Sequence, residues 1–546
     1  MIPTSCISLI RIFAPAILTA CVCLTACNSM DNLPTDSYLD KEYWTTEARA
    51  QYVLNMAYNQ MYSARQMYSD EKLSDNLIQG RTFTDERIIR NGNSEPTTWL
   101  FDYEWRDLYA GIKTCNVLIA NVGLITMPKV RIQHMIAQAR FIRAIMYLRL
   151  AQFYGDVPYF TVEPTMEEAR HMKRTPYKEV MEHIHKELDE VVEHLPSREE
   201  LRESERGQIT KGAAIAMQAR AYLYDSDWKN VERYCRMLMD MQDVYGHYGL
   251  FGSYSGLFLS DNEYNEEVIL DYAYAPKFRT WGEMFEMAPI SVGANVNDCA
   301  PTENLVEDYL MTDGRLPADS PLYDESHPYA NRDPRLTHTV IYDGYDWSGN
   351  INDGTVGKII YTNPYAADKT DSYSGYNNNQ TQTGYYVRKY YDPKHEDHLY
   401  SSINIIMIRY ADVLLMYAEA MNEQGKMSQE VWDRTVRAIR ERAGFTLVSA
   451  LDYPAIHDKL TMRSTLRRER RSELALEGLR WMDIKRWKAG PEYLNERMRG
   501  AKFENKYTRY IQLDVYQFDE NKDYLWSVPQ SQIDINKNLL PNNPGY

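Results

Sequence analysis

Apolar residues recur at helical spacing over residues 130–153, the clearest periodic pattern in the chain. They stand three and four positions apart, which places them on one face of an α-helix: Ile132, Met135, Ile136, Ala139, Ile142, Met146 and Leu150. The sequence Tyr154-Gly155-Asp156-Val157-Pro158 predicts the end of this helix, because glycine favours a C-terminal cap and proline cannot continue a helix. A long amphipathic helix is therefore predicted here.

Five further segments have helical character, and they cover residues 48–66, 177–195, 210–224, 408–423 and 466–487. The segment 210–224 is rich in alanine, and small side chains let two helices approach closely. Helix pairs with alternating small and aromatic positions resemble tetratricopeptide units, although the period of about 34 residues is degraded here. We predict a mostly α fold built on tetratricopeptide-like helix pairs.

The pattern changes between about residues 246 and 402, where Gly, Asn, Asp, Pro and Tyr dominate. Asp343-Gly344 and Asp353-Gly354 are typical turn sequences. Loops this long in a compact protein usually form a binding surface or are disordered, and their tyrosines and tryptophans favour an ordered surface. We predict a loop-rich insertion at about 246–402 between helical repeats at about 45–245 and 403–490.

The N-terminus has the pattern of an export signal. Arg11 precedes an apolar run over residues 12–24, and Leu24-Thr25-Ala26-Cys27 closes it with small residues before a cysteine. The Cys27 thiol is suited to carry a diacylglycerol, and two or more acyl chains anchor a protein stably. We predict a signal peptide over 1–26, lipidation at Cys27, a tether over 27–44 and one domain over 45–546.

The composition of the chain excludes several classes of function. The net charge of −16 argues against a nucleic-acid partner, because phosphates require Lys and Arg for neutralisation. Beyond the signal peptide no apolar run approaches the roughly 20 residues that span a bilayer. Three cysteines other than Cys27 remain, too few for a disulfide framework. The 44 tyrosines and 10 tryptophans include rings suited to stacking on sugars or peptides, although most must serve packing.

The sequence gives no sign of an enzyme. Glu469, Glu473 and Glu477 recur every four residues on a predicted helix beside Arg470, Arg471 and Arg480, which favours ion pairs over a pair of glycosidase carboxylates. His183 and His185 point to different helix faces, and no HExxH, phosphate loop or GxSxG sequence occurs. We predict no catalytic residue, no metal site and no cofactor. Calcium is the one ion kept open, at the Asp-rich loop 343–353, which lacks EF-hand spacing.

Eight short motifs follow one another along the chain. They include Ser74-Asp75-Asn76, Trp105-x-x-Leu108-Tyr109, Ala139-Arg140-Phe141, Thr210-Lys211-Gly212, Arg332-Asp333-Pro334-Arg335, Arg409-Tyr410-Ala411-Asp412, a run from Arg468 to Trp487, and the terminal Asn543-Pro544-Gly545-Tyr546. In this order they resemble the starch-utilisation SusD/RagB family of Bacteroidetes outer-membrane lipoproteins. One departure is the single Asp31 in the tether, where members often carry an acidic cluster associated with surface display.

The resemblance implies a lipid-anchored outer-membrane protein that faces the cell exterior. Such proteins capture oligosaccharides and deliver them to a SusC-like TonB-dependent transporter, which they cover as a lid. Two alternatives stay open: a RagB-like protein that binds a peptide, and an all-helical surface glycoside hydrolase or lyase.

The resemblance also indicates where the ligand binds: the loop before the Trp105 helix and the central insertion. Stacking on a sugar requires rings that face solvent, with polar side chains nearby to bind hydroxyls. The candidate ligand-binding residues on this basis are Arg81, Trp99, Tyr103, Tyr274, Trp281, Asn295, Tyr345 and Trp347. Trp105, Trp481 and Trp487 belong to helical motifs and are predicted to lie in the core.

Overall fold

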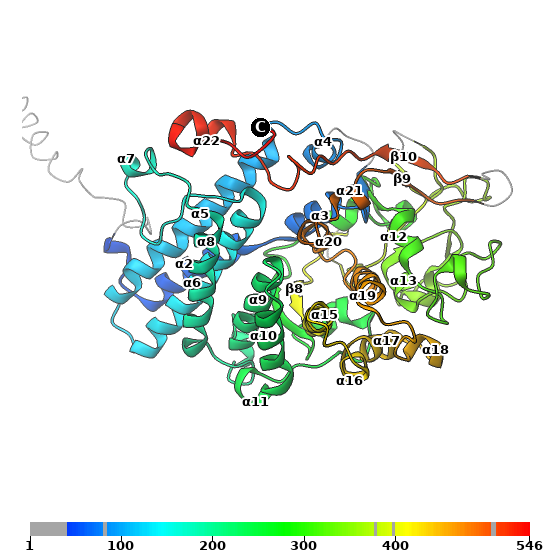
Figure 1. The fold of residues 1–546 in the computed structure, drawn as a ribbon, viewed down its shortest axis with the longest axis horizontal. Helices are drawn as coiled ribbons and strands as arrows, with labels where there is room; N and C mark the ends of the chain where they lie inside the picture. The colour runs from blue at the N-terminus through cyan, green and yellow to red at the C-terminus, as the bar shows by residue number, and fades with distance from the viewer. Residues whose placement is uncertain (1–40, 80–83, 376–378, 396–398, 504–508) are drawn as a thin grey trace, which may run out of the picture.

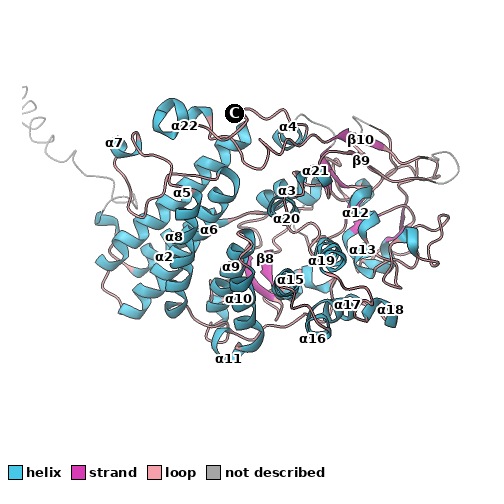
Figure 2. Cartoon of the chain, viewed as in Figure 1, coloured by secondary structure: helices cyan, strands magenta, loops and turns pink. Residues whose placement is uncertain are grey.

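The computed structural model describes residues 41–79, 84–375, 379–395, 399–503 and 509–546 (Figure 1). The predicted signal peptide and the lipidation site Cys27 lie outside these residues, as does most of the predicted tether. Helices dominate the described part of the chain, and all of its strands are short (Figure 2). The predicted mostly α architecture is confirmed.

The N-terminal part consists of helices packed side by side. They are α2 (Glu47–Met61), α3 (Ala64–Lys72), α4 (Asp85–Arg90), α5 (Trp99–Asn121), α6 (Lys129–Tyr154), α7 (Met166–Ala169), α8 (Tyr177–Val191), α9 (Lys211–Tyr224), α10 (Trp228–Asp240) and α11 (Gln242–Tyr245). Successive long helices are neighbours, since α5 packs on α6, α6 on α8, α8 on α9 and α9 on α10. Figure 1 shows α2, α5, α6 and α8 together on the left and α9 and α10 near the centre.

Local chemistry explains where these helices end. The helix predicted over 130–153 is α6, and it stops at Gly155, whose φ of +71° suits glycine. The single helix predicted over 48–66 is wrong. The chain breaks after α2 because Ser63 caps α3, with its Oγ accepting a hydrogen bond from the Gln66 N–H at 3.1 Å.

The central insertion is built from short elements. Its helices are α12 (Glu303–Asp308), α13 (Pro334–Thr339) and α14 (Trp347–Asn350). Its strands are β2 (Val268–Tyr272), β3 (Cys299–Pro301), β4 (Val340–Ile341), β5 (Tyr345–Asp346), β6 (Ile359–Ile360) and β7 (Tyr386–Val387). Two antiparallel strand pairs join the insertion to other parts of the chain: β3 pairs with β1 (Leu77–Gln79) and β2 pairs with β8 (Ile405–Arg409). A third pair, β4 with β7, lies within the insertion. The insertion is therefore tied to both helical parts.

The C-terminal part returns to helices. They are α15 (Tyr410–Glu423), α16 (Gln429–Trp432), α17 (Ala438–Ala443), α18 (Val448–Leu451), α19 (Lys459–Glu473), α20 (Arg480–Arg486), α21 (Gly490–Tyr493) and α22 (Gln530–Ile535), with the strands β9 (Arg497–Arg499) and β10 (Gln512–Val515). The prediction of one helix over 466–487 is wrong. Leu476 and Gly478 have φ values of +63° and +77°, which separate α19 from α20.

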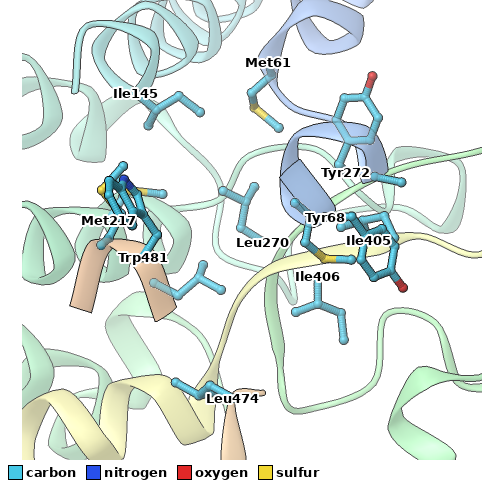
Figure 3. Close-up of a cluster of buried hydrophobic side chains, with 14 of the residues drawn as sticks. Met61, Tyr68, Ile145, Met217, Leu270, Tyr272, Ile405, Ile406, Leu474 and Trp481 are labelled. Carbon is cyan, nitrogen blue, oxygen red and sulfur yellow. The ribbon is translucent and has the colours of Figure 1, made fainter. Parts of the chain in front are cut away.

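One hydrophobic core extends through both helical parts and the insertion. Figure 3 shows side chains from distant segments meeting there, among them Met61 of α2, Ile145 of α6, Leu270 of β2, Ile405 of β8 and Trp481 of α20. Trp105 and Trp481 are buried as predicted, whereas Trp487 is half-buried and its Nε1 donates to Glu419 at 2.8 Å.

Buried ion pairs link the same segments. The Arg335 Nη1 of α13 lies 2.8 Å from Glu469 Oε1 and 2.9 Å from Glu473 Oε2 of α19. The Arg409 guanidinium at the end of β8 lies 2.7 Å from Glu267 and 2.6 Å from Glu473. Because removal of one member would leave a buried charge without a partner, such a network fixes the relative placement of its elements.

Candidate ligand-binding surface

A pair of aromatic rings lies at the start of α5, with Trp99 exposed and Tyr103 half-buried. Trp99 begins this helix and Tyr103 follows one turn later, so both side chains occupy the same face. Their rings stack with centroids 4.7 Å apart and planes inclined by 22°. The Arg65 guanidinium from α3 lies 4.6 Å from the Tyr103 ring centroid and 5.3 Å from that of Trp99. Trp99 keeps 52% of its surface exposed, although these neighbours hold it in place.

We call Trp99, Tyr103 and Arg65 the Trp99 platform. Its two rings and cation present a flat aromatic face with a hydrogen-bond donor beside it. This combination suits a sugar ring, whose C–H face stacks on an aromatic ring while its hydroxyls seek polar partners. Arg65 was not identified from the sequence, because a helical arginine carries no signal of the ring that it covers.

The segment after β2 lies alongside α3. The Tyr274 hydroxyl accepts a hydrogen bond from the Ala64 N–H at 3.0 Å, next to Arg65. The Arg279 guanidinium lies 4.1 Å from the Tyr272 ring centroid and 5.1 Å from that of Tyr274. Phe278, at the tip of this turn, is 92% exposed. Tyr274 is therefore a half-buried neighbour of the Trp99 platform, and Arg279 and Phe278 are surface residues that the sequence reasoning missed.

A cluster of buried and half-buried polar side chains lies toward the C-terminal end of α3, and we define this polar cluster by Lys72, Gln79, Glu283, Glu286 and Asp298. The Gln79 Nε2 donates to Asp298 Oδ2 at 2.6 Å, while Asp298 Oδ1 and Glu283 Oε2 are buried without a hydrogen-bond partner in the described chain. Burial is the main cause that raises the pKa of Glu283 and that of Glu286.

Lys72 supplies the positive charge of this cluster. Burial disfavours the charge of Lys72, but Cys299 and the nearby carboxylates of Glu86, Asp298 and Glu286 outweigh it and raise the pKa of the amine. Buried polar atoms without a partner are rare in native proteins, so the two free carboxylate oxygens mark this cluster as a candidate for polar contacts to a ligand. The predicted residue Asn295 is exposed near this cluster, and its N–H donates to the Phe285 carbonyl at 3.1 Å.

Three of the predicted site residues lie in the core instead. Trp281 is 4% exposed, with its Nε1 donating to the Ile403 carbonyl at 2.8 Å. Trp347 is fully buried and donates to Asp353 Oδ2 at 2.6 Å, and Tyr345 is fully buried with its hydroxyl donating to the Thr337 carbonyl at 3.0 Å. These rings anchor the loops of the insertion from inside, so they do not meet the requirement to face solvent. Arg81 lies outside the described residues.

The glutamates considered as catalytic candidates are paired with cations. Glu473 contacts Arg335, Arg409 and Arg442, and the Glu477 carboxylate contacts Arg409 at 2.7 Å and Lys389 at 2.6 Å. Burial opposes ionisation of Glu473, but the three arginines hold its pKa well below the ordinary range. Every one of these carboxylates is thus committed to an ion pair, as the sequence indicated.

The arginines expected to pair with these glutamates have other partners. Arg470 contacts Asp412 at 2.5 Å and Asp483 at 2.7 Å, while Arg471 and Arg480 both reach Asp75 at 2.8 Å. These side chains leave α19 and α20 in other directions than the glutamates, so the predicted pairing is wrong.

The remaining polar candidates have structural roles. His183 stacks on Tyr159 with centroids 4.5 Å apart, and His185 stacks on Tyr222 at 3.7 Å. Within the described residues, no three His, Cys, Asp or Glu side chains form a group suited to a metal ion. In the same part of the chain, no helix is both long and apolar enough to cross a membrane. Cys115, Cys235 and Cys299 are buried free thiols.

The fold defines the class: a mostly α-helical protein of tetratricopeptide-like helix pairs that carries a loop-rich insertion. The model of the SusD family matches residues 266–546, which is more than half of the chain. A second model, described as starch-binding associating with outer membrane, matches residues 29–223. The chain therefore belongs to the SusD family.

Individual relatives agree with this assignment over nearly the whole length. The SusD-like protein P2 of Formosa agariphila is 26% identical over 543 residues, which covers 96% of this chain and 97% of the relative. A SusD-like carbohydrate binding protein from Bacteroides fragilis has a crystal structure that superposes with a TM-score of 0.81 at 26% identity, covering 91% of this chain and 100% of that one. The surface glycan-binding protein A of Bacteroides fluxus shares the fold, with a TM-score of 0.64 at 20% identity over 92% of this chain and all of the other.

Proposed function

We propose that this protein captures oligosaccharides at the outer surface of the outer membrane. The ligand stacks on the Trp99 platform, and its hydroxyls bind the carboxylates and amine of the polar cluster. The observation that carries this proposal is the exposed Trp99 ring, stacked on the half-buried Tyr103 under the Arg65 guanidinium. A relative of 26% identity is described as a carbohydrate binding protein, which supports the same ligand class.

The proposal includes an anchor and a partner. Lipid on Cys27 holds the protein to the membrane, and a SusC-like TonB-dependent transporter receives the captured glycan. A lid that stays on its transporter requires a broad interface, of roughly 2,000 Å² or more. No chemistry is performed on the ligand, because the candidate carboxylates are held in ion pairs.

Calorimetric titration of the purified protein with glycans and with peptides tests this function. Binding of an oligosaccharide without its turnover is the expected result. Binding of peptides alone would favour the RagB-like alternative, and release of shortened sugar products would favour a hydrolase or lyase. Either outcome contradicts the proposal.

A further inference from the structure

A cleft opens between the insertion and the C-terminal part, lined by α12, the loop 316–332 and residues 502, 503 and 510. Its volume is about 970 Å³, at the upper end of the range of small-molecule sites. It shares no residue with the Trp99 platform or with the polar cluster. In Figure 1 its helix α12 lies on the right, away from α5.

Five aromatic side chains line this cleft: Tyr323, Tyr329 and Tyr510 are half-buried, and Tyr385 and Phe503 are buried. Neighbours hold several of these rings in place. Tyr329 stacks on Tyr342 with centroids 4.1 Å apart, and the Tyr329 and Tyr385 hydroxyls lie 3.2 Å from each other. The Arg499 guanidinium lies 5.1 Å from the Tyr510 ring centroid. Rings that are already ordered lose little conformational entropy when a ligand stacks on them.

A buried carboxyl group in the cleft has one oxygen that is free to bind a ligand. Glu303 is 7% exposed, and its Oε2 accepts a hydrogen bond from the Tyr385 hydroxyl. Its other oxygen makes no hydrogen bond to the described part of the chain. Burial is the main cause that raises the pKa of Glu303 to about 8, so the group is largely protonated at neutral pH and is able to donate as well as accept.

Arg332 carries a buried atom without a partner. Its side chain is 8% exposed, and its Nη1 and Nη2 donate to the Pro328 and Tyr309 carbonyls at 3.0 and 2.9 Å. Its Nε has no partner among the described residues, and Arg332 lines the cleft. Buried polar atoms are rarely left unpaired in native proteins, so this atom indicates that a ligand completes its hydrogen bonding.

The charged side chains of the lining are mostly paired. Three of its carboxylates form ion pairs: Glu307 with Arg499, Asp308 with Arg471, and Glu325 with Lys502. Glu303 adds little negative charge, because it is largely protonated at neutral pH. The cleft therefore presents little unpaired charge, which suits an uncharged ligand whose hydroxyls donate and accept hydrogen bonds.

We infer that this cleft is a second saccharide site, which takes an uncharged oligosaccharide. The partly exposed rings of Tyr323, Tyr329 and Tyr510 stack on its sugar faces, and the second oxygen of Glu303 and the Nε of Arg332 bind its hydroxyls. The inference draws on the residues of the cleft and stands whether or not the Trp99 platform binds glycan.

Tyr323→Ala tests the inference, because Tyr323 lines the cleft and is half-buried beside Arg332, Glu303 and Glu325. Tyr510→Ala is a second variant in the lining, and Tyr361→Ala is the control, since that tyrosine belongs to the insertion, is 41% exposed and lies outside the cleft. The probes for calorimetric titration are the neutral hexasaccharides of cellulose, laminarin, starch and mannan, with hexagalacturonate as the anionic probe.

We expect at least one neutral hexasaccharide to bind a site that Tyr323→Ala and Tyr510→Ala each weaken about tenfold or more. Tyr361→Ala and Trp99→Ala should leave this site unchanged, and hexagalacturonate should not occupy it. If the cleft variants bind every probe like the parent, if no neutral probe binds, or if hexagalacturonate binds the cleft most tightly, the inference is overturned. If only Trp99→Ala loses binding, the result supports the platform and rejects the cleft. If only Tyr323→Ala and Tyr510→Ala lose binding, the result supports the cleft and rejects the platform.

Discussion

The indole ring of Trp99 is half exposed and that of Trp347 is fully buried, and this difference decides what each tryptophan does. Trp99 rests on Tyr103 and under Arg65 at the surface of α5, whereas Trp347 fills the interior of the insertion and packs edge-on against Tyr391 with centroids 4.9 Å apart. A surface ring is available to a ligand, and a core ring supports the fold.

Trp347→Ala should therefore lower the free energy of unfolding by about 3–5 kcal/mol, because it leaves a large cavity in a packed interior. Denaturant unfolding measures this loss, and Trp99→Ala is the matched control, for which we expect a loss below about 1 kcal/mol. A Trp347→Ala protein as stable as the parent would contradict the placement of this ring in the core.

Sequence reasoning reached Trp99 and Tyr103 because they precede a strong helical motif. It failed at Trp281, Tyr345 and Trp347 because a loop-like sequence does not reveal that the loop folds over its own aromatic residues. Arg65 and the residues of the cleft come together only through contacts between segments distant in sequence, such as α12 and residues 502, 503 and 510.

Among the elements, the long helices follow their apolar period closely, and α6 begins one residue before its predicted start and ends one residue after its predicted end. The period does not reveal breaks set by tertiary contacts. Residues 466–487 have helical character throughout, yet the chain turns at Gly478, whose N–H donates to Glu71 Oε1 at 2.8 Å. This buried carboxylate lies on α3, some 400 residues earlier in the sequence.

Gly478→Ala should destabilise the protein for two reasons. Its φ of +77° disfavours any side chain, and an added Cβ would lie 2.7 Å from the Tyr62 hydroxyl oxygen and 3.2 Å from the Met67 Cα. Gly425→Ala is the matched control, because Gly425 has a φ of +69° but open space around its Cβ position.

We expect Gly478→Ala to cost more than about 1 kcal/mol beyond the cost of Gly425→Ala, measured by denaturant unfolding. Equal costs would show that the close approach between the α19–α20 turn and α2–α3 is not tight.

At the scale of the whole molecule, one core and its buried ion pairs join the helical repeats to the insertion. The chain thus holds its two candidate sites on one packed body. Buried carboxyl groups also make the free energy of unfolding depend on pH, and Glu303 shows the direction of this dependence.

The pKa of Glu303 is raised from 4.5 to about 8, mainly by burial, with Glu307 adding to the rise and Tyr385, Arg332 and Arg499 opposing it. The folded protein therefore keeps this proton when the unfolded chain has lost it. The contribution of Glu303 to stability falls as pH rises from about 4.5 to about 8. We expect Glu303→Gln to gain stability relative to the parent over this range, as measured by unfolding at a series of pH values. A constant difference between the two proteins would contradict the raised pKa.

Membrane attachment is a further property of the whole molecule. Cys27→Ala removes the thiol that we propose as the lipid acceptor, so the variant should leave the membrane fraction or remain an unprocessed precursor. Fractionation and lipid labelling measure this, with the parent as control. Continued lipid labelling and outer-membrane recovery of the variant would show that Cys27 is not the anchor.

The central claim is that an oligosaccharide stacks on the Trp99 platform, and calorimetric titration of Trp99→Ala with the glycan that binds the parent tests it most directly. Tyr52→Ala is the control, because Tyr52 is an exposed tyrosine of α2 outside the platform. Loss of a stacked ring should weaken binding about tenfold or more, with an unchanged melting temperature. Binding of Trp99→Ala equal to that of the parent, at every site the glycan occupies, would contradict the account.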